Sequence, residues 1–251
     1  MVTRHLIEQE DGATVELFHA HAPGTTPRGA ILLVHGYQRG HFMGAKQAVD
    51  NGALLRFSSG LNITAAAVSQ PGFGASDGPA DFCGPRTQQA IMAALSFLKE
   101  QPSVDPDRIV LYGYSRGAIA SAMVATQVPD LAAIILSSGV YDLKAAYDSS
   151  SNGVRQAIQS EAGLSSEAFL ARSALHHAHK IHTEILFLHG RRDDRAPVTQ
   201  AETFSETLSD AGVPATLNVF ECGHSIPRRY SAEVLRLFLE RIFNPSALGR
   251  I

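Results

Sequence analysis

The chain of 251 residues has few cysteines, little net charge and no long apolar run. Two cysteines, Cys83 and Cys222, do not indicate a disulfide framework. A formal net charge of −3 is too small to indicate a nucleic acid or an anionic membrane as partner. No apolar run approaches the ~20 residues needed to cross a bilayer, so we expect no membrane insertion.

The first residues, Met1 to His5, lack the basic segment and apolar core of a signal peptide, which favours a cytoplasmic location. Hydrophobic residues make up 45% of the chain and charged residues 18%, as in ordinary globular proteins. The chain contains no internal repeat, low-complexity tract or clear linker. We therefore expect a single α/β domain over residues 1–251, a length that allows one large core.

Short apolar runs alternate with segments of helical periodicity, which predicts an α/β fold with a mostly parallel central sheet and helices on both faces. An Asp-Gly pair at residues 11–12 predicts that the first two strands form a hairpin. The predicted strands are residues 3–9, 14–20, 30–34, 63–69, 109–112, 131–136, 184–189 and 216–220. The predicted helices include residues 45–57, 86–100, 199–211 and 231–243.

The sequence Gly113-Tyr114-Ser115-Arg116-Gly117 follows a predicted buried strand and precedes an alanine-rich helix. A sharp turn between strand and helix can expose one side chain at the carboxyl edge of a sheet. The two glycines fit because a bulkier residue would collide with the neighbouring strand or helix. Ser115 is the candidate nucleophile; the alternative is a glycine-rich turn with a bystander serine.

A serine nucleophile needs a base within hydrogen-bond reach, and that base needs an orienting acid. Asp193 and His224 each come just after a predicted late strand. The chain order Ser115, Asp193, His224 is the order that this type of turn requires. Three alternatives remain open. The first is that Asp193 is only a turn residue, the second is that Asp194 or Asp142 is the acid, and the third is that His224 is an ordinary loop histidine.

The other histidines have weaker claims to a catalytic role. His35 and His189 lie at strand ends, where we expect local hydrogen bonds. A second group of histidines offers metal binding as an alternative, but no carboxylate or cysteine pattern surrounds it. We expect neither a metal nor another cofactor. The group consists of His176, His177, His179 and His182.

A reaction at Ser115 also needs N–H donors for the oxyanion. One donor is expected to be the backbone N–H of Arg116, the residue after the serine. The second should come from the loop after strand 30–34, and Tyr37 is the candidate, with Gln38 as the alternative. Gly36 would let the backbone of that loop approach the substrate closely.

Residues 141–180 interrupt the alternation with a long, polar, partly helical segment. A connection of this length inside a compact domain is usually a lid or a binding element, and we interpret it as a small helical cap. The alternative is a surface excursion without a role. Tyr114 in the sharp turn and Tyr141 at the start of the segment are the candidate substrate contacts.

These motifs give the chain a resemblance to the α/β-hydrolase superfamily, and its second half resembles the catalytic domain of the prolyl oligopeptidase family, here without a β-propeller. The resemblance rests on residues 113–117, His189-Gly190-Arg191-Arg192-Asp193-Asp194-Arg195 and Gly223-His224. It implies an α/β-hydrolase fold with Ser115 as nucleophile, Asp193 as acid and His224 as base. His35-Gly36-Tyr37 resembles the oxyanion motif of the superfamily.

The combination of motifs favours a serine carboxylesterase that cleaves small carboxylic esters through an acyl-enzyme. The Gly-Gly-Ser-Tyr-Gly-Gly form of the turn, frequent in the peptidases of this family, is absent. One alternative is a small peptidase or amidase that uses the same triad. Another is a catalytically silent binding module. The expected partner is a small-molecule ester.

Overall fold

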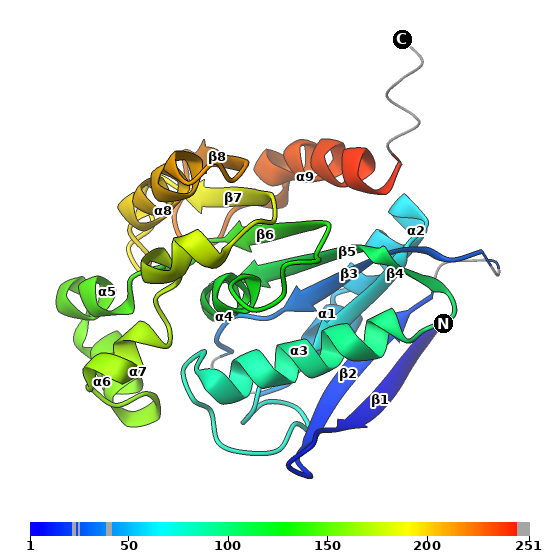
Figure 1. Cartoon of the computed structure of the whole chain (residues 1–251), viewed down its shortest axis with the longest axis horizontal. Coiled ribbons are helices and arrows are strands. Elements are labelled where there is room, and N and C mark those ends of the chain that lie inside the picture. The colour runs from blue at the N-terminus through cyan, green and yellow to red at the C-terminus, as the bar shows by residue number, and fades with distance from the viewer. Residues whose placement is uncertain (22–23, 25, 39–41, 245–251) are drawn as a thin grey trace.

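The computed structural model describes residues 1–21, 24, 26–38 and 42–244. Within them, eight strands form one sheet in the order β1-β2-β4-β3-β5-β6-β7-β8 (Figure 1). Strands β1 and β2 pair antiparallel, as do β2 and β4, and every other neighbouring pair is parallel. The predicted mostly parallel sheet is therefore confirmed.

The bounds of the elements follow the predicted alternation closely. The strands are β1 Val2–Glu8, β2 Thr14–Ala20, β3 Arg28–Val34, β4 Thr64–Val68, β5 Val104–Tyr114, β6 Ala133–Ser137, β7 Ile185–Gly190 and β8 Ala215–Phe220. The helices are α1 Lys46–Asp50, α2 Ala53–Leu61, α3 Pro85–Lys99, α4 Arg116–Ala125, α5 Leu143–Ser149, α6 Asn152–Glu161, α7 Ser166–Leu170, the 3₁₀ helix η1 Ala174–Lys180, α8 Val198–Asp210 and α9 Arg228–Phe243.

Helices cover both faces of the sheet, and the central strands divide their side chains between two cores. Leu32 and Val34 of β3 pack in the core formed with α3, α4 and α8, whereas Ile31 between them packs with α2 and α9. Successive side chains of a strand point to opposite faces. A strand buried on both faces must be apolar at every position, which explains the continuous apolar run in β3.

Two local features confirm or correct the sequence-based expectations. Gly12 has φ 81° and the Gln9 N–H donates to Ala13 O, so the predicted hairpin is confirmed. The predicted helix 45–57 is wrong in its continuity, because it divides into α1 and α2 at Gly52, which has φ 71°. A left-handed backbone cannot continue an α-helix, and the Asn51-Gly52 pair is a typical turn signal.

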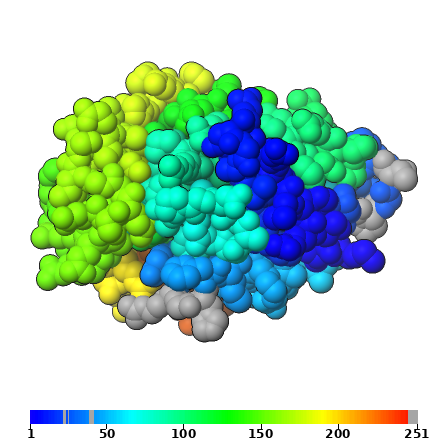
Figure 2. All heavy atoms as spheres, turned by 90° about the horizontal axis from the view of Figure 1, so that it is seen from below, coloured from blue at the N-terminus to red at the C-terminus, as the bar shows by residue number. Residues whose placement is uncertain are grey.

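Residues 141–180 contain α5, α6, α7 and η1. The first three helices lie together at one end of the molecule, the end toward which the arrowheads of β3 and β7 point (Figure 1). Seen from below, this segment lies beside the residues around position 80 (Figure 2). Arg172 ties the two together, because its Nη2 donates to Asp81 O (2.8 Å) and its Nε to Phe82 O (3.0 Å).

Within the described residues, no helix combines the length and the apolar character that crossing a bilayer requires.

Candidate active site

Ser115 occupies a sharp turn between β5 and α4. Its backbone has φ 53° and ψ −118°, a conformation that a non-glycine residue rarely adopts. Such strain costs about 1–3 kcal/mol and is typical of functional sites. Both flanking glycines are sterically required: a Cβ at Gly113 would lie 2.4 Å from Gly117 O, and one at Gly117 would lie 2.2 Å from Val34 O.

His224 lies beside Ser115 although the two are far apart in the sequence. The loop after β8 places His224 Nε2 2.9 Å from Ser115 Oγ. On its other side, His224 Nδ1 lies 2.8 Å from Asp193 Oδ2 and 3.0 Å from Oδ1. An ionised carboxylate only accepts hydrogen bonds, so Nδ1 carries the proton and Nε2 is free to accept the Ser115 hydroxyl. The structure thus brings the three predicted triad residues together.

Asp193 is buried, yet it is held in its ionised form. Burial alone would raise its pKa, but hydrogen bonds from His189, His224 and the N–H groups of Ala196 and Arg195 outweigh burial and hold the pKa well below the usual range. Its Oδ1 accepts from both backbone N–H groups at 2.9 Å. The carboxylate is therefore fixed in position and charged, as an orienting acid must be.

The rival acids lie in other surroundings. Asp194 is exposed to solvent. Asp142 is the N-cap of α5, where its Oδ1 accepts from the Ala145 N–H (3.1 Å). The carboxylate in contact with His224 is that of Asp193.

His35 and His189 make the local hydrogen bonds that the sequence predicts. His35 Nδ1 lies 2.8 Å from Gly36 O, and the Gln70 N–H donates to Nε2 (3.1 Å). His189 Nε2 lies 2.7 Å from Ala196 O and 3.4 Å from Asp193 Oδ2. His189 therefore supports the loop that carries Asp193, a contact that sequence reasoning did not identify.

The histidines of residues 176–182 do not converge on one point. His176 Nε2 lies 3.4 Å from Asp142 Oδ2, and His177 Nε2 lies 3.2 Å from Leu170 O. In the part of the chain that the structure describes, no three His, Cys, Asp or Glu side chains are grouped so that they could hold a metal ion.

The loop after β3 lies against the nucleophile. A Cβ at Gly36 would lie 3.0 Å from Ser115 Cβ and 3.1 Å from Tyr114 O, so any larger residue would crowd the backbone of the nucleophile turn. The next residue is Tyr37, and the N–H of Arg116 opens α4, directly after Ser115. Arg116 is therefore adjacent to Ser115, and Tyr37 follows the glycine that lies against Ser115; both stay predicted oxyanion donors. Gln38 is the alternative backbone donor. Its side chain is buried and forms hydrogen bonds with the backbone of Gly44.

The side chain of Arg116 makes contacts that sequence reasoning did not identify. Its Nη1 and Nη2 donate to the Glu161 carboxylate at 2.7 and 3.2 Å. Its guanidinium lies 4.6 Å from the ring centroid of Tyr37 and 4.1 Å from that of Phe82. Because these partners come from distant parts of the chain, no local pattern indicates them.

The two tyrosines assigned to substrate binding have different surroundings. The Tyr114 ring lies 5.6 Å from the His224 ring, and its hydroxyl lies 3.3 Å from Ser225 Oγ, so it borders the site. Tyr141 is only 1% exposed and packs on Phe187 and Phe204. Its side chain belongs to the core, which corrects the expectation that Tyr141 contacts substrate.

Comparisons with solved structures identify the fold. The puromycin-hydrolyzing peptidase of Mycobacterium tuberculosis superposes with a TM-score of 0.80 at 20% identity, over 97% of this chain and 39% of that one. The Pyrococcus furiosus esterase Pf2001 superposes with a TM-score of 0.74 at 17% identity, over 96% of this chain and 91% of that one. These likenesses confirm the predicted α/β-hydrolase fold.

Sequence comparisons identify the family. Two curated relatives come from Bacillus subtilis (strain 168). The uncharacterized peptidase YtmA is 25% identical over 165 residues, 64% of each chain. The uncharacterized peptidase YuxL is 26% identical over 152 residues, 59% of this chain and 23% of that protein. The matches thus span less than two thirds of either relative. Residues 83–244, well over half of the chain, match the prolyl oligopeptidase family, and the protein accordingly belongs to that family.

Proposed function

We propose that this protein is a serine carboxylesterase that hydrolyses small carboxylic esters through an acyl-enzyme. The observation that carries the proposal is the continuous hydrogen-bonded chain from Ser115 Oγ through the His224 imidazole to the Asp193 carboxylate. A serine hydroxyl near neutral pH is a poor nucleophile without such a base, and the base needs a fixed orientation.

In the proposed reaction, Ser115 Oγ attacks the ester carbonyl carbon while His224 Nε2 takes its proton. The N–H groups of Tyr37 and Arg116 stabilise the oxyanion of the tetrahedral intermediate. As the intermediate collapses, His224 returns the proton to the departing alcohol, and Ser115 keeps the acyl group. A water molecule then attacks the acyl-enzyme while His224 takes its proton. Collapse of this second intermediate releases the acid, and His224 returns the proton to Ser115 Oγ. Asp193 holds the imidazolium in both halves.

Residues 141–180 act as the cap over this site in the proposal. Two contacts support the assignment: the ion pair from Glu161 on α6 to Arg116, and the hydrogen bond from Gln88 Nε2 to Ala171 O (2.8 Å). The exposed side chains of Tyr37 and Phe42 provide apolar surface near the oxyanion loop. A small cap encloses a modest pocket, so acyl groups of about two to six carbons are favoured.

The surroundings of two acidic residues favour esters over peptides. A peptidase that recognises a free amino terminus needs carboxylates available to the substrate ammonium. Glu161 is already engaged by Arg116. Glu167, in the first turn of α7, forms a hydrogen bond with Ser165, the N-cap of that helix, whose Oγ also accepts from the Ala168 N–H (3.1 Å). The Glu161 carboxylate is therefore not available to hold a peptide amine, and Glu167 is a single exposed carboxylate rather than one of a pair.

A small peptidase or amidase is the second candidate, because the chain belongs to the prolyl oligopeptidase family and both Bacillus subtilis relatives carry the name peptidase. Amides have a poorer leaving group, which His224 must protonate as it departs. A side-by-side assay of p-nitrophenyl butyrate and butyryl p-nitroanilide separates the two activities. We expect kcat/KM for the ester to be higher by more than about tenfold. Equal or faster cleavage of the anilide would favour the peptidase, and no turnover of either would favour the binding module.

A further inference from the structure

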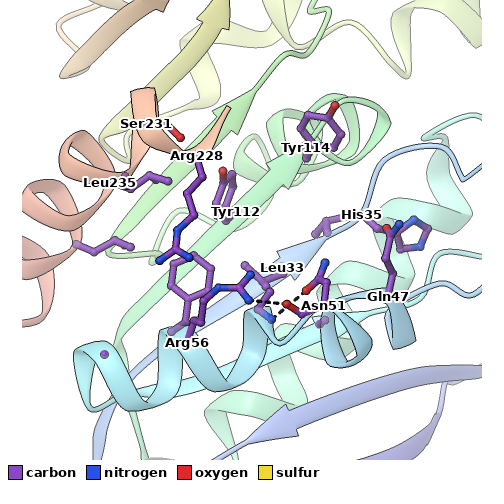
Figure 3. A pocket seen from close by; sticks show the side chains of 18 of the residues that line it. Leu33, His35, Gln47, Asn51, Arg56, Tyr112, Tyr114, Arg228, Ser231 and Leu235 are labelled. Carbon is purple, nitrogen blue, oxygen red and sulfur yellow. Dashed lines mark hydrogen bonds between the residues drawn. The ribbon is translucent and has the colours of Figure 1, made fainter. Parts of the chain in front are cut away.

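A groove of about 690 Å³ lies on the face of the sheet opposite α3 and α4. Helices α1 and α2 form one wall, α9 forms the other, and β3 and β5 form the floor (Figure 3). Its volume falls in the range of about 300–1,000 Å³ that is typical of small-molecule sites. Its apolar surface comes mainly from Leu33, Phe57, Leu61, Tyr112, Leu235 and Leu239.

Two arginines extend into this groove from opposite walls. Arg56 comes from α2 and turns its guanidinium toward Asn51, whereas Arg228 comes from the first turn of α9 and extends toward the wall formed by α2 (Figure 3). Arg56 Nη1 donates to Asn51 O. Among the described residues, neither arginine forms an ion pair, whereas Arg236, also in the groove, pairs with Glu240 at 2.7 Å. The groove therefore carries two positive charges without a carboxylate partner.

The groove is separate from the triad. Ser115, Asp193 and His224 are not among its lining residues. Tyr114 and Gly36 form the wall at the end nearest the triad, and the Tyr114 hydroxyl lies 3.3 Å from Ser225 Oγ. A ligand in the groove would therefore contact a different set of residues from the triad.

From this combination we propose that the groove binds an aliphatic carboxylate with a chain of about ten to fourteen carbons, a length set by the volume of the groove. The alkyl chain is buried against the apolar floor. The carboxylate binds the guanidinium groups of Arg56 and Arg228 in the lining of the groove, because guanidinium groups bind carboxylates through paired, charge-assisted hydrogen bonds. A neutral or cationic amphiphile of the same length cannot form these charge-assisted hydrogen bonds with the arginines. The proposal does not depend on the esterase activity.

Isothermal titration of the full chain with dodecanoate tests the site, with dodecanol and dodecyltrimethylammonium as matched probes. We expect dodecanoate to bind at least about tenfold more tightly than either. In the series octanoate, decanoate, dodecanoate, each step of two methylenes should tighten binding by up to about tenfold. Absence of dodecanoate binding, or equal binding of all three amphiphiles, would overturn the proposal.

Variants locate the binding. Arg56→Gln and Arg228→Gln should each weaken dodecanoate binding by about tenfold and leave dodecanol binding unchanged. Arg229→Gln is the matched control, since this exposed arginine neighbours Arg228 without lining the groove. Ala232→Phe places a ring inside the groove and should weaken both ligands. Thermal unfolding confirms that each variant is folded. Unchanged dodecanoate binding in folded Ala232→Phe, or a loss in Arg229→Gln equal to that in Arg228→Gln, would place the ligand elsewhere.

Discussion

The guanidinium of Arg116 and the carboxylate of Glu161 form a two-bonded ion pair at 2.7 and 3.2 Å. It joins the residue that follows Ser115 to the last residue of α6. Both side chains are mostly buried, at 12% and 20% exposure. Because Arg116 also stacks on Tyr37, the position of α6 is linked to the loop proposed to hold the oxyanion.

Replacing Glu161 should therefore affect stability and activity together. Glu161→Gln leaves the buried Arg116 guanidinium without a charged partner, and we expect the free energy of unfolding to fall by ~1–3 kcal/mol. The value of kcat/KM for short esters should fall as well. Urea unfolding and ester kinetics measure the two effects. The control is Glu167→Gln, which removes an exposed charge from α7 and should change stability by less than ~0.5 kcal/mol. Identical behaviour of the two variants would contradict this role for the ion pair.

The two adjacent aspartates should respond differently to the same substitution. Asp193→Asn keeps the size of the side chain but favours the wrong tautomer of His224, so kcat should fall by about 10⁴. Asp194→Asn should stay close to wild type, because Asp194 is exposed. Steady-state ester kinetics on the two purified variants make the comparison. A severe loss in Asp194→Asn with a mild one in Asp193→Asn would show that the acid has been assigned to the wrong neighbour.

The protein should lose stability on mild acidification. Burial lowers the pKa of His35 from 6.5 to about 4, and burial lowers the pKa of His19 to about 4 as well. Between these values the unfolded chain binds protons that the native state excludes, so the free energy of unfolding decreases as pH falls from 6.5 to about 4.

His35→Gln should make the free energy of unfolding depend less steeply on pH. Some dependence should remain, because the pKa of His19 is lowered as well. Urea unfolding at several pH values between 4 and 7 measures the slope. The exposed residue His179 offers a control, and His179→Gln should leave the slope as in wild type. An unchanged slope in His35→Gln would mean that the buried imidazole is not the source of the acid sensitivity.

Local patterns in the sequence were sufficient to predict the fold and the residues now found together at the site. Strand β5, the two glycines around Ser115 and α4 are contiguous, so one short stretch contains the signal for the whole turn. Asp193 and His224 each follow a strand of the parallel part of the sheet, and the carboxyl ends of parallel strands meet at one edge. Their position at the same edge of the sheet as Ser115 follows from the topology.

The features that the sequence did not reveal depend on tertiary packing. Tyr141 stands at the start of the cap segment, but its ring turns into the core between Phe187 and Phe204. An aromatic residue at such a boundary has the same sequence appearance whether it faces the core or the substrate. The partnership of Arg116 with Glu161 spans 45 positions and depends on the path of α6. No local periodicity encodes such a contact.

The central claim is that Ser115 carries the acyl group during ester hydrolysis, and trapping that intermediate tests it most directly. Acid quenching of the protein during turnover of p-nitrophenyl butyrate, followed by peptide mass mapping, should place one butyryl group on Ser115. Ser115→Ala should retain the wild-type circular dichroism spectrum, carry no butyryl group and lose about 10⁶ in kcat. A butyryl group on another residue, or near wild-type hydrolysis by folded Ser115→Ala, would contradict the account.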